Sequence, residues 1–461
     1  MLRESGNLPE TVEVLVLGAG IAGHCAALAA AEAGAQVLLL EKSAQAGGSS
    51  AMAGGGFAFS GTDLTLAAGQ DDSIEAFRRD LFASGQGQNN PALVDRFLAH
   101  QLEAYEFLKA HGVKFQIYDA VPRIHTTGTG RAVTNLHVAA RAHPHIQFFS
   151  KSAAMRLDRS RQGGRVDLAT IFYGDQERTI TATRGIVLAT GGFSRSREML
   201  RIFAPELLDA VKHGGVANTG DGLMMASMLG AGLADLGYVT GSFGGAIRNY
   251  PHGVQGADEV PPLLFAFQAG GIIVNRDGRR FINEDQSYKT LSPIGMQQPG
   301  GVGFQIFDEK LIRLSMSDSS VNNYAEALHG DYLRKANTIA GLAELMGLDP
   351  STLQQTVDRY NQDVAAGRDT LFGRVKDLMA IDTPPYYIAA TANALTSTYG
   401  GITTDGDMAV TDWLGQPIPG LFAVGEVVGG FHGAGYYSAS SLSSSATFGM
   451  CAGRAAAGVA I

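Results

Sequence analysis

The chain has 461 residues, of which 60 are glycine, and a formal net charge of −9. This length predicts two domains or one domain with a large insertion, and the charge, which comes without a basic cluster, argues against nucleic acid or an anionic membrane surface as a partner. The chain has two cysteines, Cys25 and Cys451, which exclude a disulfide framework, a cysteine metal site and a CxxCH haem attachment. Because the sequence shows no secretory signal and no apolar run of transmembrane length, we expect a cytoplasmic protein with no membrane insertion.

The first predicted element is a strand over residues 11–17, which leads directly into Gly18-Ala-Gly-Ile-Ala-Gly23. A small-residue helix and a second strand, residues 36–40, follow, and Glu41 stands at the end of that strand. This order is typical of a dinucleotide-binding βαβ unit. The glycines allow a tight turn and the close approach of a pyrophosphate, which the start of the helix attracts. We expect Glu41 to accept hydrogen bonds from the adenosine ribose.

A glycine-rich stretch and several periodic elements come next. Residues 46–56 read Ala-Gly-Gly-Ser-Ser-Ala-Met-Ala-Gly-Gly-Gly, and we expect a flat ligand to lie against this bare backbone. A flexible linker is the alternative, but linkers rarely follow a nucleotide-binding strand so closely. Residues 72–112 have the spacing of helices, and Asp71-Asp72-Ser73 caps one helix start. Residues 165–183 predict a hairpin that turns at Gly174-Asp175, and residues 185–192 predict a buried parallel strand.

The composition of the sequence changes in its second half. Asn218-Thr-Gly-Asp-Gly222 precedes another predicted helix of small residues, whereas residues 245–398 contain most of the prolines. This stretch predicts a hairpin over residues 271–283 and a helix beginning near Ser351. The glycine-rich style returns at Tyr399. We therefore expect a nucleotide-binding domain built from both ends of the chain, with an inserted α+β domain that acts as a lid.

Five motifs in this order resemble the flavoprotein family of fumarate reductases, succinate dehydrogenases and 3-ketosteroid dehydrogenases. They are GAGIAG with Glu41, GGSSAMAGGG, ATGG at residues 189–192, NTGDG at 218–222 and PGLFAVGEVVGGFHGAG at 419–435. The resemblance implies an α/β fold with a glutathione-reductase-type FAD-binding domain, residues 1–244 and 399–461. Residues 245–398 are then an α+β capping domain that traps substrate against the flavin.

The same resemblance assigns the cofactor residues. The helix beginning near Ser441-Leu442 would direct its positive end at the flavin N1/C2 carbonyl, and Glu426 would hold the ribityl chain. Residues 46–56 lack the histidine that tethers flavin in covalent members, so we expect non-covalent FAD. The residues expected to bind FAD are Gly18, Gly20, Ile21, Ala22, Gly23, Glu41, Lys42, Ser43, Gly47, Gly48, Ser49, Ser50, Ala53, Gly54, Gly55, Thr190, Gly191, Asn218, Asp221, Gly425, Glu426, Ser441 and Leu442.

Electrons must enter or leave through a separate donor or acceptor. The chain has no second GxGxxG after a strand for NAD(P)H, and no haem or iron–sulfur motif.

The positions that bind a dicarboxylate in fumarate reductases are changed. The family's arginines become Tyr288 and Tyr436, its histidines become Tyr250 and Ser397 or Thr398, and its proton relay falls on Leu264 and Phe267. A dicarboxylate finds little positive charge among these side chains. Tyrosine offers an apolar face with one donor, which suits a largely hydrophobic ligand that bears a carbonyl.

These tyrosines resemble the arrangement in 3-ketosteroid dehydrogenases. The predicted catalytic residues are Tyr288, Tyr436, Ser438 and Tyr250. Tyr436 or Ser438 would hold the ketone oxygen, and Tyr288 would remove the α-proton as a base while the β-hydride passes to the flavin. A basic tyrosine needs a lowered pKa, and the candidate cations are Arg248, Lys289 and Arg280. We expect Tyr386 and Tyr387 to fill the core.

Three functions are compatible with these residues and motifs. The first is an FAD-dependent dehydrogenase that introduces, or in reverse reduces, a C=C bond next to a carbonyl in a bulky apolar substrate. The second is a reductase or dehydrogenase of an unsaturated carboxylate, with Arg248 or Arg131 as the carboxylate clamp. The third is a flavin-binding protein without turnover. His432 either contacts substrate or, as the resemblance implies, shapes the backbone, and Arg131 either reaches the substrate entrance or forms a surface salt bridge, which we favour. We assign His125 and Asp221 to the structure beside the flavin.

Overall fold

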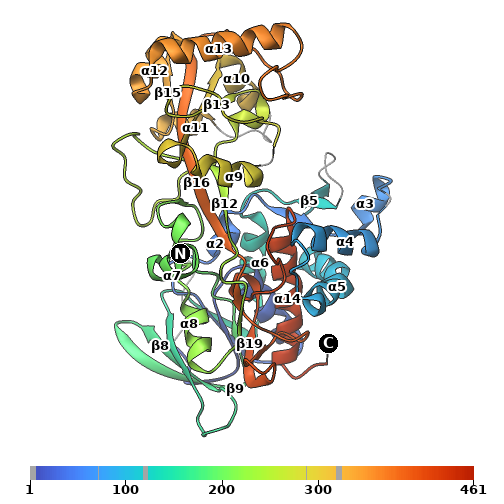
Figure 1. The fold of residues 1–461 in the computed structure, drawn as a ribbon. Coiled ribbons are helices and arrows are strands. Elements are labelled where there is room, and N and C mark those ends of the chain that lie inside the picture. The colour runs from blue at the N-terminus through green and yellow to red at the C-terminus, as the bar shows by residue number, and fades with distance from the viewer. Residues whose placement is uncertain (1–6, 71, 118–122, 287, 318–323, 461) are drawn as a thin grey trace. The chain divides into compact units, whose positions relative to one another are not determined.

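The structure is a computed structural model that describes residues 7–70, 72–117, 123–286, 288–317 and 324–460. The chain divides into two compact units (Figure 1). Unit 1 comprises Met1–Pro205, Gly214–Val239 and Ser397–Ile461, and unit 2 comprises Glu206–His213 and Thr240–Thr396. Within the described residues, no helix has both the length and the apolar character needed to cross a membrane.

Unit 1 is a mixed α/β structure. Its strands are β1 Thr11–Leu17, β2 Val37–Leu40, β3 Gly56–Ala58, β4 Gln116–Ile117, β5 Ile124–Thr126, β6 Ile146–Phe149, β7 Ala153–Asp158, β8 Leu168–Tyr173, β9 Gln176–Leu188, β11 Leu233–Ala234, β17 Gly401–Ile402, β18 Ala409–Thr411 and β19 Pro417–Ala423. Its helices are α1 Ile21–Glu32, α2 Gly48–Met52, α3 Asp63–Ala67, α4 Ile74–Ser84, α5 Pro91–Ala110, α6 Arg131–Ala142, α7 Arg197–Phe203, α8 Asp221–Met228 and α14 Ser440–Ala456, with a 3₁₀ turn at Gly425–Val427. A further 3₁₀ turn, Pro205–Leu207, begins in unit 1 and ends in unit 2.

The central sheet of unit 1 has the strand order β18-β19-β9-β1-β2-β6. The pairs from β19 to β6 are parallel, and β7 and β8 extend β9 as an antiparallel meander. The strand β1 is buried on both faces because Val14, Leu15 and Val16 have no exposed surface, as a parallel strand covered by helices requires. The carboxyl ends of β1, β2, β9 and β19 therefore meet at one edge of this sheet.

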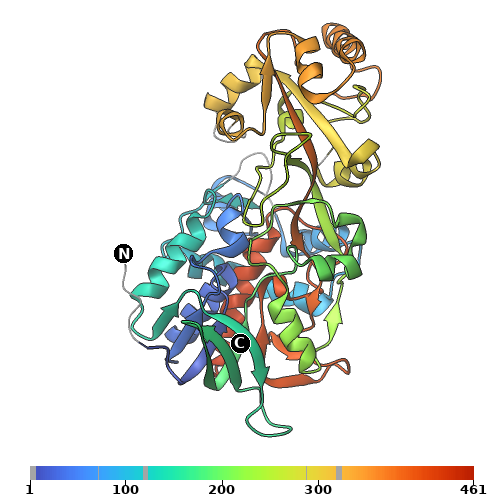
Figure 2. The same ribbon diagram turned by 90° about the vertical axis from the view of Figure 1, so that its left-hand side faces the viewer.

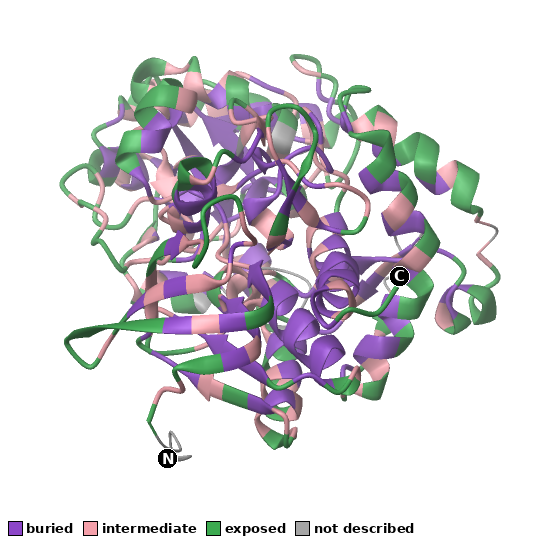
Figure 3. Ribbon diagram, turned by 90° about the horizontal axis from the view of Figure 1, so that it is seen from below, coloured by how far each residue is buried: buried purple, intermediate pink, exposed green. Residues whose placement is uncertain are grey.

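Helix α14, from the C-terminal end of the chain, packs along α1 (Figure 2). Every residue of α1 from Ile21 to Ala31 is buried, and Figure 3 shows the buried helices in purple. A side chain at Gly449 would overlap the carbonyl oxygen of Ala22 and stand 3.0 Å from the Cβ of Cys25. The two backbones can approach this closely only because Gly449 lacks a Cβ.

Unit 2 is an α+β structure. Its strands are β10 Val211–Lys212, β12 Val239–Ala246, β13 Ile272–Val274, β14 Val302–Asp308, β15 Arg334–Ala336 and β16 Tyr386–Thr398, of which β12 and β16 begin or end in unit 1. Its helices are α9 Tyr288–Met296, α10 Glu309–Ser317, α11 Tyr324–His329, α12 Ile339–Met346 and α13 Pro350–Ala365, with 3₁₀ turns at Ala266–Ala269 and Pro299–Gly301. Its sheet has the order β10-β16-β14-β13, and β12 and β15 also pair with β16.

The core of unit 2 consists of separate apolar clusters. One, with Phe304 and Ile388, lies against α12 and α13. Another contains Phe243, Phe267, Ile273, Ile282 and Leu291. Side chains of alternate residues on β13 supply both clusters, since successive residues of a strand point to opposite faces.

Several elements match the sequence expectations. Strand β1 has the predicted bounds, β2 begins one residue later than predicted, and β8 and β9 form the predicted hairpin around Gly174-Asp175. The α4 helix begins after Ser73, whose side chain accepts from Ala76 N at 3.1 Å. Asp71, part of the predicted cap, lies outside the described residues.

The hairpin expected over residues 271–283 is wrong in its second strand. Strand β13 forms, but it pairs with β14, and Arg280 makes only an isolated bridge to Val274. A side chain replaces the missing strand, because Ile273 N donates to the Glu284 carboxylate at 3.1 Å. The chain therefore turns away to place Arg280 and Glu284 inside unit 2.

We predict that Gly449→Ala destabilises the protein by about 1–3 kcal/mol, because an added methyl group at this helix contact forces overpacking. Urea unfolding, followed by circular dichroism, measures the change. Gly406→Ala is the control, since the nearest atom to its added Cβ would be 3.6 Å away. Equal midpoints for the two variants would contradict the close-packing argument.

Candidate active site

The glycine turn between β1 and α1 has the geometry of a phosphate-binding loop. Gly18 has φ +108°, and a Cβ at Gly23 would overlap the Gly18 carbonyl oxygen. Helix α1 starts at Ile21 without a side-chain cap from Gly20, although Ser50 Oγ accepts from Ile21 N at 3.1 Å. The loop therefore presents backbone N–H groups with the positive end of a buried helix behind them.

Glu41 and Lys42 extend this loop at the end of β2. The two carboxylate oxygens of Glu41 accept from Ala19 N at 3.0 Å and Ser43 N at 2.8 Å. Each oxygen retains a further lone pair for a ribose hydroxyl. Lys42 Nζ forms an ion pair with Asp221 Oδ2 at 2.6 Å and donates to Thr219 at 2.5 Å. These contacts join β2 to the start of α8, within unit 1.

A second polar group gathers around Glu426, which follows β19. Its carboxylate accepts from Asn218 Nδ2 at 2.9 Å and Thr398 N at 3.0 Å. Ser49 Oγ accepts from the same Asn218 amide at 3.0 Å. Desolvation raises the pKa of Glu426, and these hydrogen bonds oppose the rise. The structure thus brings together Ser49, Asn218 and Glu426, all three of which are expected from the sequence to bind the cofactor.

Helix α14 starts at this region, and its first turn has no side-chain cap. Its cap residue Ala439 has φ +66° and makes no side-chain cap hydrogen bond. In an uncapped first turn, N–H groups remain for an external acceptor. Ser441 and Leu442 lie in that turn, as expected from the sequence.

These residues fit a flavin nucleotide if they leave room for it and offer it an unused hydrogen-bonding group. A Cβ at Gly48 or Gly54 would have no atom within 4 Å, so bare backbone borders open space there. The buried Thr190 Oγ1 has no hydrogen-bond partner among the described residues. A glycine-lined trough with an unused hydroxyl and two helix starts is the donor set that a dinucleotide requires.

Two of the predicted catalytic residues lie just before α14. The Tyr436 ring stacks on Tyr399 at 6.0 Å, with an interplanar angle of 18°, and lies 5.6 Å from the His432 ring. His432 Nε2 is 3.5 Å from Ser441 Oγ. Ser438 is exposed. Unit 1 therefore holds Tyr436, Ser438 and His432 on one short segment beside the start of α14.

The other two predicted catalytic residues belong to unit 2 and are not in one cluster. Tyr288 is partly buried against Phe243 and Phe267, and its ring lies 5.1 Å from Phe265. Tyr250 packs with the Phe304 cluster, its ring 5.3 Å from the Phe304 ring. Tyr250 also lines a cavity of about 610 Å³ together with Arg248 and Arg334, and Tyr288 is not among the residues that line it.

The pKa of Tyr288 moves in the direction opposite to the expectation. Burial raises this pKa above its ordinary value because an apolar surrounding penalises the charged phenolate. Arg248 forms an ion pair with Glu259 at 3.4 Å and lines the Tyr250 cavity instead. The side chain of Lys289 lies outside the described residues.

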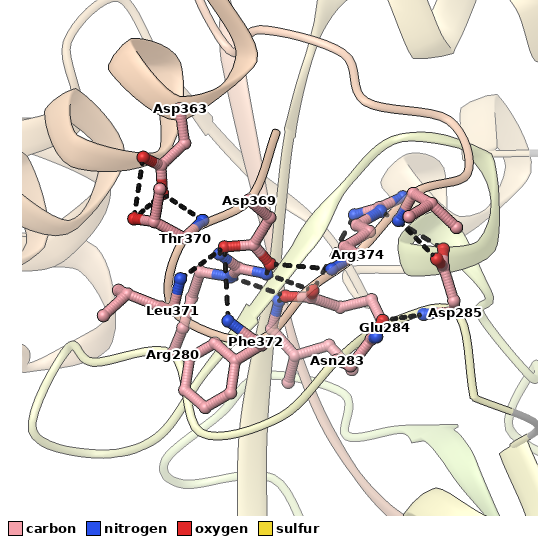
Figure 4. A network of polar contacts seen from close by, with 12 residues as sticks. Arg280, Asn283, Glu284, Asp285, Asp363, Asp369, Thr370, Leu371, Phe372 and Arg374 are labelled. Atoms are coloured by element: carbon pink, nitrogen blue, oxygen red, sulfur yellow. Dashed lines mark hydrogen bonds and ion pairs between the residues drawn. The ribbon is translucent and has the colours of Figure 1, made fainter. Parts of the chain in front are cut away.

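Arg280 is fully engaged elsewhere in unit 2 (Figure 4). Its guanidinium donates to Glu284 at 2.5 and 2.9 Å and to Asp369 at 2.9 and 3.1 Å. Neither carboxylate is exposed. Because both partners are buried acids, Arg280 has no charge left to stabilise a tyrosinate.

The remaining candidates have structural surroundings. His125 is buried and bonds Thr62 Oγ1 at 2.7 Å through Nε2. Tyr387 donates to Glu309 at 2.8 Å and stacks on Phe307, and Tyr386 is partly buried against the Phe304 cluster. Arg131 is exposed, and the surface salt bridge favoured for it does not form with any of the described residues.

Two residues of the site were not predicted from the sequence. Thr219, the partner of Lys42, lies within the NTGDG motif, and its place between Asn218 and Asp221 is a signal that could have indicated it. Arg123, whose contacts are described below, lies in none of the five motifs, so no local pattern indicates it.

Comparisons with known proteins show what the whole chain is similar to. A family model described as an FAD binding domain matches residues 13–442. The chain is 32% identical over 464 residues to a probable fumarate reductase, Ifc3, of Shewanella frigidimarina, covering 97% of this chain and 75% of that protein. The structure is similar to the open conformation of a flavocytochrome c3 fumarate reductase, with a TM-score of 0.84 and 30% identity over 97% of this chain and 78% of that one.

It is also similar to 3-ketosteroid-Δ4-(5α)-dehydrogenase from Rhodococcus jostii RHA1 in complex with 4-androstene-3,17-dione. That match has a TM-score of 0.73 and 25% identity, and it covers 98% of both chains. The family match establishes FAD as the cofactor of this chain.

We predict that the flavin is released by acid. Since no histidine occurs in residues 46–56, precipitation with trichloroacetic acid should leave all visible absorbance near 450 nm in the supernatant, where about 450 nm is the ordinary oxidised-flavin band. A yellow pellet would contradict non-covalent binding.

Proposed function

The chain belongs to the FAD-binding-domain family matched over residues 13–442, and from that membership we propose that it acts on the CH–CH or C=C bond next to a carbonyl in a bulky apolar substrate. Fumarate reductases and a ketosteroid dehydrogenase are its relatives, and both names fit chemistry at a carbon–carbon bond. We propose unit 2 as the capping domain for that substrate.

One observation carries the proposal, namely the phenol of Tyr288 on an aromatic wall. Phe265 and Phe267 lie beside it, and Leu264 and Phe267, on which the family's proton relay falls, are buried and apolar. Such a wall favours a hydrophobic ring system over a dicarboxylate, which would lose its hydration against an apolar surface. The phenol supplies the single polar contact.

We assign separate roles to the phenols. Tyr436 or Ser438 donates a hydrogen bond to the substrate carbonyl oxygen, where negative charge gathers in an enolate-like transition state. When bound, FAD supplies the acceptor or donor of hydride. Tyr288, with its raised pKa, remains protonated at neutral pH and suits the delivery of a proton to the α-carbon in the direction of reduction. Tyr250 remains a weaker prediction because it packs in another cluster.

An unsaturated carboxylate is the second candidate substrate. The Arg248 side chain is 47% exposed and makes a single contact at 3.4 Å to Glu259 among the described residues, so several of its donors remain for a carboxylate. The 32% identity to a probable fumarate reductase favours the same reading.

Under either function we propose that the electron partner is a separate molecule. We expect a quinone, a dye-like acceptor or oxygen, because the given sequence has neither a haem motif nor an NAD(P)H motif. Both cysteines are free and buried, which fits the cytoplasmic setting that we expect.

We predict that a 3-ketosteroid bleaches the oxidised flavin under anaerobic conditions, or that its unsaturated analogue reoxidises the reduced flavin. Stopped-flow absorbance measures both directions. Reoxidation by small enoates alone would favour the carboxylate function. A flavin that changes with neither class would indicate a binding protein without turnover.

We also predict that Tyr288→Phe lowers the rate of enone reduction by about 10²–10⁴-fold, the usual contribution of a general acid. Because burial raises the Tyr288 pKa, this phenol stays protonated as the pH rises, and its ionisation should not lower the wild-type rate at any pH below about 10. Tyr324→Phe is the matched control: Tyr324 is also buried in an aromatic cluster of unit 2 and its pKa is also raised by burial. Unchanged turnover of Tyr288→Phe with flavin bound would remove it as the acid.

A further inference from the structure

The segment that carries Tyr436 and Ser438 is closed by main-chain hydrogen bonds in unit 1. The Tyr437 carbonyl accepts from Ser440 N at 3.1 Å and from Ser440 Oγ at 2.6 Å. The Ala439 carbonyl accepts from Ala58 N, on β3, at 3.2 Å. The backbone is therefore fixed on the side of α14, but these bonds do not hold the side chains.

The Tyr437 side chain adds a second attachment. Arg123 Nη1 donates to Tyr437 Oη at 3.3 Å. The Phe77 ring, on α4, lies 5.4 Å from the Tyr437 ring, and the Arg123 guanidinium lies 4.9 Å from the centre of the same Phe77 ring. Tyr437 is thus held by one polar and one aromatic contact, neither of which comes from its own segment.

Arg123 is itself immobilised. Its side chain is 7% exposed. Nε and Nη2 donate to the two oxygens of Asp72, and Nη1 donates to Asp80 at 2.5 Å as well as to Tyr437. A planar guanidinium bound in this bidentate way has a defined orientation. The hydroxyl of Tyr437 is therefore attached to a rigid group.

Tyr436 and Tyr437 contact different neighbours. Tyr436 stacks on Tyr399 and lies near His432, whereas Tyr437 contacts Phe77 and Arg123. The Arg123 contact thus restrains the segment without occupying the surroundings of Tyr436. A restraint of this kind can set the position of a neighbouring donor to within a fraction of an ångström.

We propose that Arg123 and Tyr437 are positioning residues, whose hydrogen bond fixes Tyr436 and Ser438 for the substrate carbonyl. The proposal rests on the function proposed above for these two residues. Neither Arg123 nor Tyr437 needs to touch the substrate.

The ionisation of Tyr437 agrees with this role. Burial raises its pKa, Arg123 lowers it, and Asp80 and Asp72 raise it again, with a net increase. The phenol therefore stays neutral at physiological pH and keeps a lone pair to accept from Arg123.

Tyr437→Phe tests the proposal in the holoenzyme, since it removes the hydroxyl but keeps the ring against Phe77. We expect amide hydrogen exchange over residues 434–442 to rise about tenfold, because the segment loses a restraint and opens locally. For a substrate that turns over, we expect kcat to fall about 10- to 100-fold while KM stays within about threefold, the pattern of lost orientation and not of lost binding.

Matched controls separate positioning from general damage. Tyr173→Phe removes a hydroxyl from a partly buried tyrosine that lies 5.7 Å from Phe149 in the same unit. Arg123→Lys should reproduce Tyr437→Phe, whereas Arg78→Lys should not, although Arg78 also binds an aspartate and lies over a phenylalanine ring.

The two measurements have distinct outcomes. Unchanged exchange in Tyr437→Phe overturns the anchor, and raised exchange with unchanged kcat overturns its part in catalysis. If wild-type enzyme turns over no ketone or enone, the proposed function fails, while exchange still decides whether the anchor exists.

Discussion

The site in unit 1 depends on the close contact between α1 and α14. The first helix begins at the glycine loop and the last begins beside Tyr436 and Ser438. Because Gly449 lets the two backbones meet, the uncapped starts of two helices from opposite ends of the chain are held as one rigid piece. A ligand that needs both positive ends can be bound without further ordering of the protein.

The polar contacts of unit 1 show how a buried acid can be kept where no cationic partner occurs among the described residues. Glu426 is satisfied by the Asn218 amide and the Thr398 N–H, which lie far apart in the sequence. Hydrogen bonds from neutral groups stabilise its charge only partly, so its pKa stays raised. The Lys42–Asp221 pair, in contrast, is about 30% exposed on each side chain and makes a modest contribution to stability.

The extent to which structure could be predicted from sequence varies with the range of the interactions. Strand β1, the glycine turn and Glu41 follow from local pattern, because strand period and turn geometry are local properties. The failed second strand of the 271–283 hairpin depends on Glu284 replacing a backbone partner, which no periodicity reveals. Asp369, a partner of Arg280, and Tyr437, a partner of Arg123, are likewise distant in sequence, so neither the engagement of Arg280 inside unit 2 nor the support of Tyr437 could be inferred before the fold.

The charged network in unit 2 has a consequence for how the chain can change over time. Arg280 joins Glu284 to Asp369, and the buried Arg374 donates to the carbonyl oxygens of Phe267 and Gly271 at 2.9 and 2.6 Å. If a substitution removes one of these charged side chains, another remains buried without its partner. The effect of each substitution in the network therefore depends on the others. Descendants of this protein should either keep all of it or replace it through coordinated exchange of several residues, and unit 2 should accept new side chains at exposed positions more readily than at interior ones.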